Sequence, residues 1–192
     1  MAEARIYAAL KADHDRHRDL LERIGNTSLL SSERGPLFEE LRKELQAHAA
    51  AEEESLYATM LRNPELRDEA RHSVSEHKEV DDLLGELDAM SPHDPRWYVK
   101  FRQMRHRYLH HIDEEEQEMF PAAAEKLPKA EEDKAARIFT ERKPAELERA
   151  EHEKPGDERD VLLTRLSPGP PISRTPPDRG RRTGAPRRPA PG

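Results

Sequence analysis

The stretch HAAAEEESLY, residues 48–57, returns 63 residues later as HIDEEEQEMF, residues 111–120. Each copy places a glutamate four residues after a histidine and an aromatic residue nine residues after it. An internal repeat of this kind indicates a unit that buries its apolar face against its own copy. The sequence therefore predicts a domain made of two similar halves.

The repeat extends well beyond this stretch. Under the same shift DHDRHRDLL at 13–21 aligns with EHKEVDDLL at 76–84, and the apolar residues near 38–45 fall on those near 101–108. Apolar residues at helical spacing predict helices over about 2–24, 36–61, 64–90 and 95–121, and no segment alternates like a strand. We therefore expect an all-α fold, an up-down-up-down four-helix bundle built from two repeated helical hairpins.

Two further segments follow the bundle. An Ala-, Glu- and Lys-rich stretch over 129–152 predicts a short fifth helix interrupted by Pro144. Beyond Pro155 proline, glycine and arginine dominate, which favours disorder because such a segment buries little. The expected organisation is a bundle at 1–127, an additional helical segment at 128–154 and a disordered tail at 155–192.

Composition excludes several kinds of site. The chain has no cysteine, so disulfides and thiolate metal sites are absent. Its net charge is −7, but the last 26 residues carry six Arg against one Asp, which leaves about −12 before them. We expect no nucleic-acid surface on the bundle, and at most a weak anionic partner for the tail. No signal peptide or membrane span is apparent, so we expect a cytoplasmic protein and no membrane partner.

Few polar residues are the same in both copies of the repeat, and those that are lie where apolar residues are expected. His48 and Glu52 continue the seam begun by Leu41 and Leu45, and the same holds for His111 and Glu115 in the second half. Burying an unpaired carboxylate costs several kcal/mol, and two facing carboxylates cannot both stay ionised. A bound cation removes both costs. The six predicted metal ligands form two equal sets, which suits two ions bridged by the carboxylates: His14, His48, Glu52, His77, His111 and Glu115.

This pattern resembles the hemerythrin-like family, also called the HHE cation-binding domain. The family has one His on the first helix, HxxxE on the second, one His on the third and HxxxE on the fourth, and the six residues match in type and order over about residues 3–125. The resemblance implies a non-haem di-iron centre, with two iron ions bridged by carboxylates and an oxo or hydroxo group. Such centres bind or react with dioxygen, nitric oxide or peroxide, or sense iron.

One position departs from the oxygen carriers of that family. They have a fifth histidine four residues before the third-helix histidine, where this chain has Ser73, with His72 one step away. Two six-coordinate irons have about 12 coordination positions. Four histidines, two bridging carboxylates and a bridging oxygen fill about ten of them, so about two stay open, although Glu53 or Glu116 could fill one. Open positions favour reaction with small oxidants over oxygen storage. We expect a metal-binding or sensing protein with a small diatomic or peroxide ligand, rather than a dedicated enzyme.

Other interpretations stay open at this stage. The site could be a structural or storage site for zinc or iron, or the bundle could be an interaction module without metal. Ferritin-like proteins use Glu-x-x-His, which does not match the spacing here. We expect the remaining histidines to be structural or exposed, and Tyr57 and Phe120 to belong to the core and cap the site. His106 with His110 could chelate zinc, and Glu114 offers a competing register that the 63-residue shift disfavours.

Overall fold

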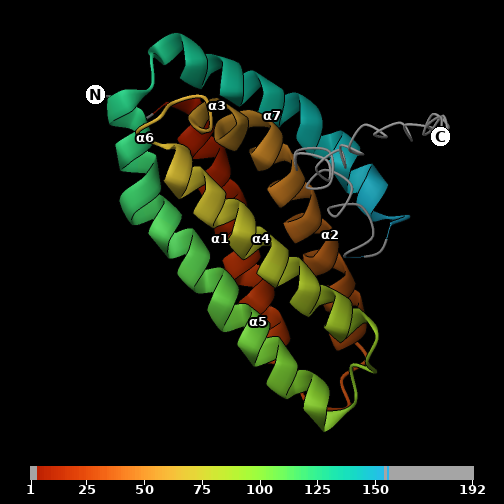
Figure 1. The fold of residues 1–192 in the computed structure, drawn as a ribbon. Helices are drawn as coiled ribbons and strands as arrows, with labels where there is room; N and C mark the ends of the chain where they lie inside the picture. The colour runs from red at the N-terminus through yellow and green to blue at the C-terminus, as the bar shows by residue number, and fades with distance from the viewer. Residues whose placement is uncertain (1–3, 154, 156–192) are drawn as a thin grey trace, which may run out of the picture.

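The described structure consists of helices and their connections. The computed structural model describes residues 4–153 and 155, and no strand occurs within them. The bundle consists of α1 (Arg5–Gly25), α2 (Arg34–Glu52) continued by η1 (Glu53–Tyr57) and α3 (Ala58–Met60), α4 (Arg67–Asp88), and α5 (Pro95–Glu114) continued by η2 (Glu115–Met119) and α6 (Phe120–Lys126). Figure 1 shows the four long stretches side by side, with α7 (Lys129–Ala150) lying along α2. The predicted all-α bundle of two hairpins is confirmed.

The helix ends follow from local chemistry. α5 begins at Pro95 as predicted, and the Asp94 side chain caps it by accepting a hydrogen bond from the Arg96 amide at 2.8 Å. α4 begins three residues later than the Pro64 of the prediction. The reason is that the Asn63 side chain accepts a hydrogen bond from the Glu65 amide at 3.0 Å and closes a turn there.

Two π-helical segments, η1 and η2, interrupt the second and fourth long stretches, and the sequence did not predict them. η1 starts directly after Glu52, and η2 starts at Glu115; these are the glutamates of the two HxxxE motifs predicted to bind metal. Hydrogen bonds from residue i to i+5 bring a residue five positions later onto the same face. This geometry favours placing Tyr57 on the same side of the helix as Glu52, and Phe120 on the same side as Glu115; all four side chains are buried.

α7 is neither short nor interrupted, which corrects the expectation drawn from Pro144. It runs for 22 residues with Pro144 inside it. The cost of a proline is outweighed here because packing stabilises the helix on both sides of it. Arg142 pairs with Glu54 at 2.6 Å, and the Ala150 carbonyl accepts a hydrogen bond from Arg42 Nη2 at 3.0 Å.

The buried core divides into two apolar clusters along the bundle. One lies towards the α1–α2 and α4–α5 turns and includes Leu20, Leu41, Leu84 and Phe101. The other, which also includes Ala135, Ala136 and Phe139 of α7, fills the opposite end. In the order of the sequence, four of the predicted ligands lie between the two clusters: His14, His48, His77 and Glu115. Glu52 lies within the stretch of the second cluster and His111 within that of the first, so apolar residues flank all six.

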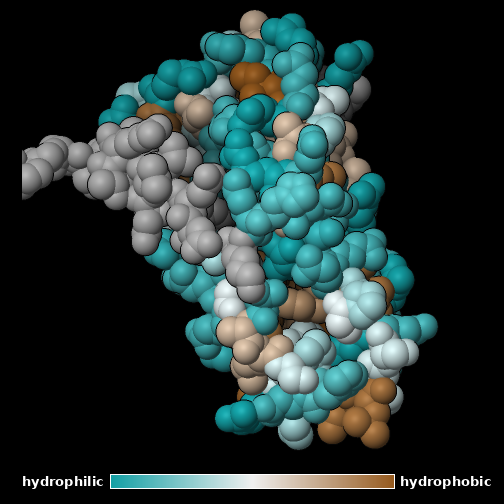
Figure 2. Space-filling model, turned by 90° about the vertical axis from the view of Figure 1, so that its right-hand side faces the viewer, coloured by the Kyte–Doolittle hydropathy of each residue, from teal (hydrophilic) through white to brown (hydrophobic). Residues whose placement is uncertain are grey.

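The outer surface is mainly polar. The face seen in Figure 2 is largely hydrophilic, with apolar residues confined to small patches. Among the described residues, no helix has both the length and the apolar character to cross a bilayer. The predicted disordered tail lies, apart from Pro155, outside the described residues.

Candidate metal centre

All six predicted ligands lie in the interior of the bundle. Their exposed fractions are 0% for His14, 1% for His48, 0% for Glu52, 3% for His77, 0% for His111 and 1% for Glu115. Each half of the repeat contributes two histidines and one glutamate. The sequence therefore identified a set of side chains that the fold buries together.

The histidines form two pairs. His14 and His48 face each other with their Nε2 atoms 3.2 Å apart, and the rings of His77 and His111 lie with centroids 4.7 Å apart. The first pair comes from the first hairpin and the second pair from the second hairpin. The repeat thus produces two similar imidazole pairs, one from each hairpin.

The two glutamates lie between the histidine pairs. Glu115 directs Oε2 at His14 Nε2, 3.4 Å away, and Oε1 at His111 Nε2, 3.6 Å away. Glu52 Oε2 lies 3.3 Å from His48 Nε2 and 3.6 Å from His77 Nε2. Each carboxylate therefore faces one member of both pairs, which is the arrangement that a bridging ligand requires.

Every one of the four histidines has a carboxylate on its outer nitrogen, a feature that the sequence analysis missed. The Nδ1–oxygen distances are 2.8 Å for His14 with Glu116, 3.2 Å for His48 with Asp13, 2.8 Å for His77 with Glu53, and 3.0 Å for His111 with Glu76. A carboxylate at Nδ1 fixes the proton there and leaves the Nε2 lone pair for a metal. The sequence did hold a signal for this, because the four carboxylates also align under the 63-residue shift.

The inner carboxyl groups do not ionise alike. Burial and then the negative charge of Glu52 raise the pKa of Glu115 to about 7. Burial also opposes ionisation of Glu52, but His48, whose Nε2 lies 3.3 Å from Glu52 Oε2, outweighs it and lowers the pKa of Glu52 to about 2. The protein alone thus accommodates one negative charge at this level of the bundle more readily than two. A cation would relieve this constraint.

The unpaired atoms test whether a metal pair suits the site. Both oxygens of Glu52, Oε2 of Glu115, and Nε2 of His77 and His111 are buried and have no hydrogen-bond partner among the described residues. Buried polar atoms are nearly always paired, so a cluster of unpaired lone pairs calls for a ligand. Imidazole nitrogens and carboxylate oxygens suit iron, zinc or manganese. The residues therefore fit a metal pair.

The two halves differ at the aromatic residues of the repeat. Tyr57 stacks on the His77 ring, and its hydroxyl donates a hydrogen bond to Glu115 Oε1. Phe120, its counterpart, stacks on His14 and has no hydroxyl to donate. Of the two inner glutamates, Glu115 alone receives a hydrogen bond from a hydroxyl group of the described residues, so the two ends of the centre are chemically distinct.

This chain has Ser73, not a histidine, at the position of the fifth histidine of oxygen carriers. Ser73 is buried and its hydroxyl interacts with that of Tyr57, while His72 is 64% exposed on the outer face of α4. His17 is buried near His48, but its Nδ1 is 2.6 Å from the Tyr108 hydroxyl and its Nε2 faces Glu44. Burial lowers the pKa of His17 to about 3, so it is a neutral core residue.

α7 completes the surroundings of one histidine pair. Lys143 forms an ion pair with Asp13, whose carboxylate holds His48, and also lies 3.1 Å from Glu44. Phe139 packs its ring edge-on against His48, with centroids 5.9 Å apart. α7 lies outside the repeat, so the 63-residue shift gave no signal for these contacts.

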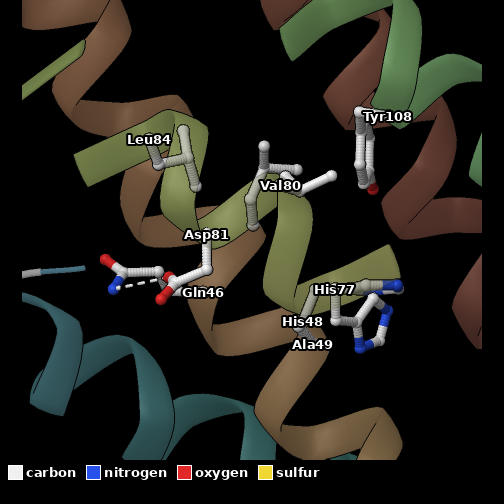
Figure 3. A pocket seen from close by; sticks show the side chains of 9 residues that line it. Gln46, His48, Ala49, His77, Val80, Asp81, Leu84 and Tyr108 are labelled. Carbon is white, nitrogen blue, oxygen red and sulfur yellow. Dashed lines mark hydrogen bonds between the residues drawn. The ribbon is translucent and has the colours of Figure 1, made fainter. Parts of the chain in front are cut away.

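A small cavity reaches two of the ligands. It is lined by Leu45, Gln46, His48, Ala49, His77, Val80, Asp81, Leu84 and Tyr108, and its volume is about 10 Å³. Figure 3 shows the His48 and His77 rings together at one end and the Gln46–Asp81 hydrogen bond away from them. This volume is about the least that holds one water molecule, so the cavity beside His48 and His77 is small.

Comparison with known proteins agrees with this geometry. A chain from Mycobacterium kansasii, described as a hemerythrin HHE cation binding domain-containing protein, superposes with a TM-score of 0.68 and 27% identity, over 85% of this chain and 99% of that one. A protein from Nostoc sp. named DNA nickase is 32% identical over 90 residues, which are 47% of this chain and 25% of that protein. This chain thus spans about a quarter of the length of that curated relative.

The family match covers the whole bundle. The model of the hemerythrin HHE cation binding domain matches residues 5–123, which include all six inner histidines and glutamates and extend from α1 into α6. The fold, the ligand order and this match agree with one another. The chain therefore belongs to the hemerythrin HHE cation-binding domain family, and its bundle is a metal-binding domain.

Proposed function

We propose that this protein is a non-haem di-iron protein that binds, senses or detoxifies dioxygen, nitric oxide or peroxide, or senses iron. The observation that carries the proposal is the pair of buried glutamates, each facing a histidine of both pairs. The proposed ligands of one ion are His14 and His48, those of the other are His77 and His111, and Glu52 and Glu115 bridge. An iron pair, when bound, supplies one-electron redox chemistry and open positions for a small ligand.

The side chains around the centre support this role. The outer carboxylates hold each imidazole in one tautomer and orientation, so little rearrangement is needed when iron binds. The apolar clusters on both sides keep bulk water away from the ligands. Tyr57 holds Glu115 by a hydrogen bond at one end of the site only.

The size of the cavity supports a small ligand. About 10 Å³ next to His48 and His77 is about the least that holds one water molecule, so the cavity is too small for an organic substrate. Without a fifth histidine, more of the coordination positions are left for such a molecule. The proposal is therefore reaction with or sensing of small oxidants, rather than oxygen storage.

DNA cleavage is not part of this proposal. The nickase name belongs to a protein of which this chain matches a quarter. The chain before residue 167 carries a net charge of about −12, which repels a phosphate backbone.

Metal analysis and optical spectroscopy test the proposal. Protein purified from iron-replete cells without a nickel column should contain about two iron ions per chain. It should also show a near-ultraviolet band that dithionite removes and air restores. His77→Ala should lose iron, whereas His106→Ala, an exposed histidine of α5, should retain it. Metal without a reversible spectral change would identify a structural or storage site and refute the redox role.

A further inference from the structure

A second cluster of imidazoles and carboxylates lies on the outer face of α4 and α5. His72 precedes Glu76 by four residues on α4, and His110 precedes Glu114 by four on α5, so both pairs have the HxxxE spacing. His72 Nε2 lies 3.6 Å from Glu76 Oε1 and 4.0 Å from Glu114 Oε2, and His110 Nε2 lies 3.3 Å from Glu114 Oε1. One donor atom from each of His72, Glu76 and Glu114 lies within 4.8 Å of the others.

Glu76 belongs to this cluster and to the inner centre at once. Its Oε2 holds His111 Nδ1 at 3.0 Å, while its Oε1 is buried and has no hydrogen-bond partner among the described residues. The nearest cationic groups to Oε1 are His72 and Arg107, both at 3.6 Å. Arg107 makes its shorter contact, 2.7 Å, with Glu79. Glu76 is 2% exposed, and its Oε1 is therefore directed at the outer cluster without a close hydrogen-bond donor among the described residues.

The repeat shows what occupies the same place in the first half. Under the 63-residue shift the four residues of the cluster fall on Ala9, Asp13, Ala47 and Ala51. In that half α7 covers the face, and the ammonium group of Lys143 pairs with Asp13. In the second half His72 is 64% exposed and His110 is 53% exposed, so the face is open to solvent. In the other half the guanidinium group of Arg107 lies 3.6 Å from Glu76 and makes its shorter contact, 2.7 Å, with Glu79, so Glu76 is held by a more distant cation than Asp13 is.

We propose that His72, Glu76, His110 and Glu114 form an outer site for a divalent metal ion. Two imidazoles and two carboxylates favour a borderline ion such as Zn²⁺, Fe²⁺ or Mn²⁺ over Mg²⁺ or Ca²⁺, which prefer oxygen ligands alone. The bound ion takes the same place beside Glu76 that the Lys143 ammonium group takes beside Asp13. Because Glu76 also holds His111, the outer ion shares a carboxylate with the buried centre. The outer site does not depend on the identity of the metal in that centre.

Zinc binding to the full chain tests the outer site. Zn²⁺ bound per chain is measured by equilibrium dialysis for wild type, for His72→Ala/His110→Ala and for the control His93→Ala/His106→Ala. Both pairs of histidines are exposed, so both variants should fold. We expect wild type and control to bind one Zn²⁺ more than the outer-site variant. The single variant His72→Ala should weaken that binding at least about tenfold, the lower end of the loss caused by removing a supporting ligand.

The outcome is separable from that of the proposed iron centre. Iron content after growth in iron-replete medium should be the same in wild type and in the His72→Ala/His110→Ala variant, because neither residue is an inner ligand. Equal Zn²⁺ binding by all three proteins would overturn the outer site, and so would an equal loss in the His93→Ala/His106→Ala control. A protein that lacks iron but still shows the Zn²⁺ difference would refute the iron centre alone.

Discussion

Replacing Glu115 with glutamine should stabilise the protein without metal and weaken its metal binding. Glu115 is 1% exposed, and the rise of its pKa from the ordinary 4.5 to about 7 corresponds to about 3 kcal/mol against the ionised form. The folded chain thus holds a proton that the unfolded chain releases between these two pH values. Stability should fall as pH rises from about 4.5 to about 7, and the full penalty applies above that range.

Glutamine fits the same place without the charge. The Tyr57 hydroxyl donates to Glu115 Oε1 and can donate equally to an amide oxygen. The amide group takes the place of the carboxylate beside His14 Nε2, which lies 3.4 Å from the replaced Oε2. Burial lowers the pKa of His14 to about 4, so His14 is neutral at pH 7 and loses no ion pair in the exchange. Metal-free Glu115→Gln should therefore exceed wild type by about 3 kcal/mol at pH 8 and by only about 1 kcal/mol at pH 5.

Urea unfolding of chelator-treated protein, followed by circular dichroism at pH 5 and pH 8, measures this difference. Glu118→Gln, an exposed glutamate of the same η2 segment, is the matched control and should leave stability unchanged at both pH values. Metal titration of the same variant should show weaker binding, because a neutral amide replaces a bridging anion. A Glu115→Gln protein that is less stable than wild type at pH 8, or a difference that does not change with pH, would refute the reasoning.

Three further predictions concern the surroundings of the centre. Lys143→Met should destabilise the fold by about 1–3 kcal/mol in urea unfolding, because it removes the cation shared by two largely buried carboxylates, Asp13 and Glu44. The exposed control Lys134→Met should change little; equal effects would contradict the role of α7. Asp13→Asn should lower metal affinity about 10- to 100-fold in chelator competition, because the Asp13 carboxylate orients His48 through its Nδ1. Unchanged affinity would show that this contact does not affect metal binding. Metal affinity should also rise with pH, at least about 10-fold per unit between 7 and 9 and more steeply below 7, because binding displaces protons from Glu115, His48 and His111. Burial lowers the pKa of His48, but Asp13 and Glu52 outweigh it and raise that pKa to about 9; affinity that stays constant from pH 6 to 9 would contradict this.

The repeat made most of the fold predictable. Helical spacing and turn residues gave the four long stretches, because each half shows the same apolar pattern twice. The π-helical segments were not predictable in the same way, since Glu53–Tyr57 and Glu115–Met119 carry no composition that distinguishes them from α-helix. The continuity of α7 through Pro144 was predicted wrongly, because tertiary packing outweighed the local propensity of proline.

The inner ligands were predictable because six polar residues occupy an apolar seam. Their assignment as metal ligands stays a prediction, although the structure brings all six together. The outer carboxylates could have been found from the same shift, since Asp13 aligns with Glu76 and Glu53 with Glu116. Lys143 could not, because its contact with Asp13 joins residues 130 positions apart and α7 has no copy in the repeat.

Anomalous diffraction at the iron absorption edge, from crystals of the iron-loaded chain, tests the central claim most directly. We predict two peaks inside the bundle, one beside His14 and His48 and one beside His77 and His111, both within coordination distance of Glu52 and Glu115. A single peak, no peak, or either glutamate directed at solvent would contradict a carboxylate-bridged iron pair.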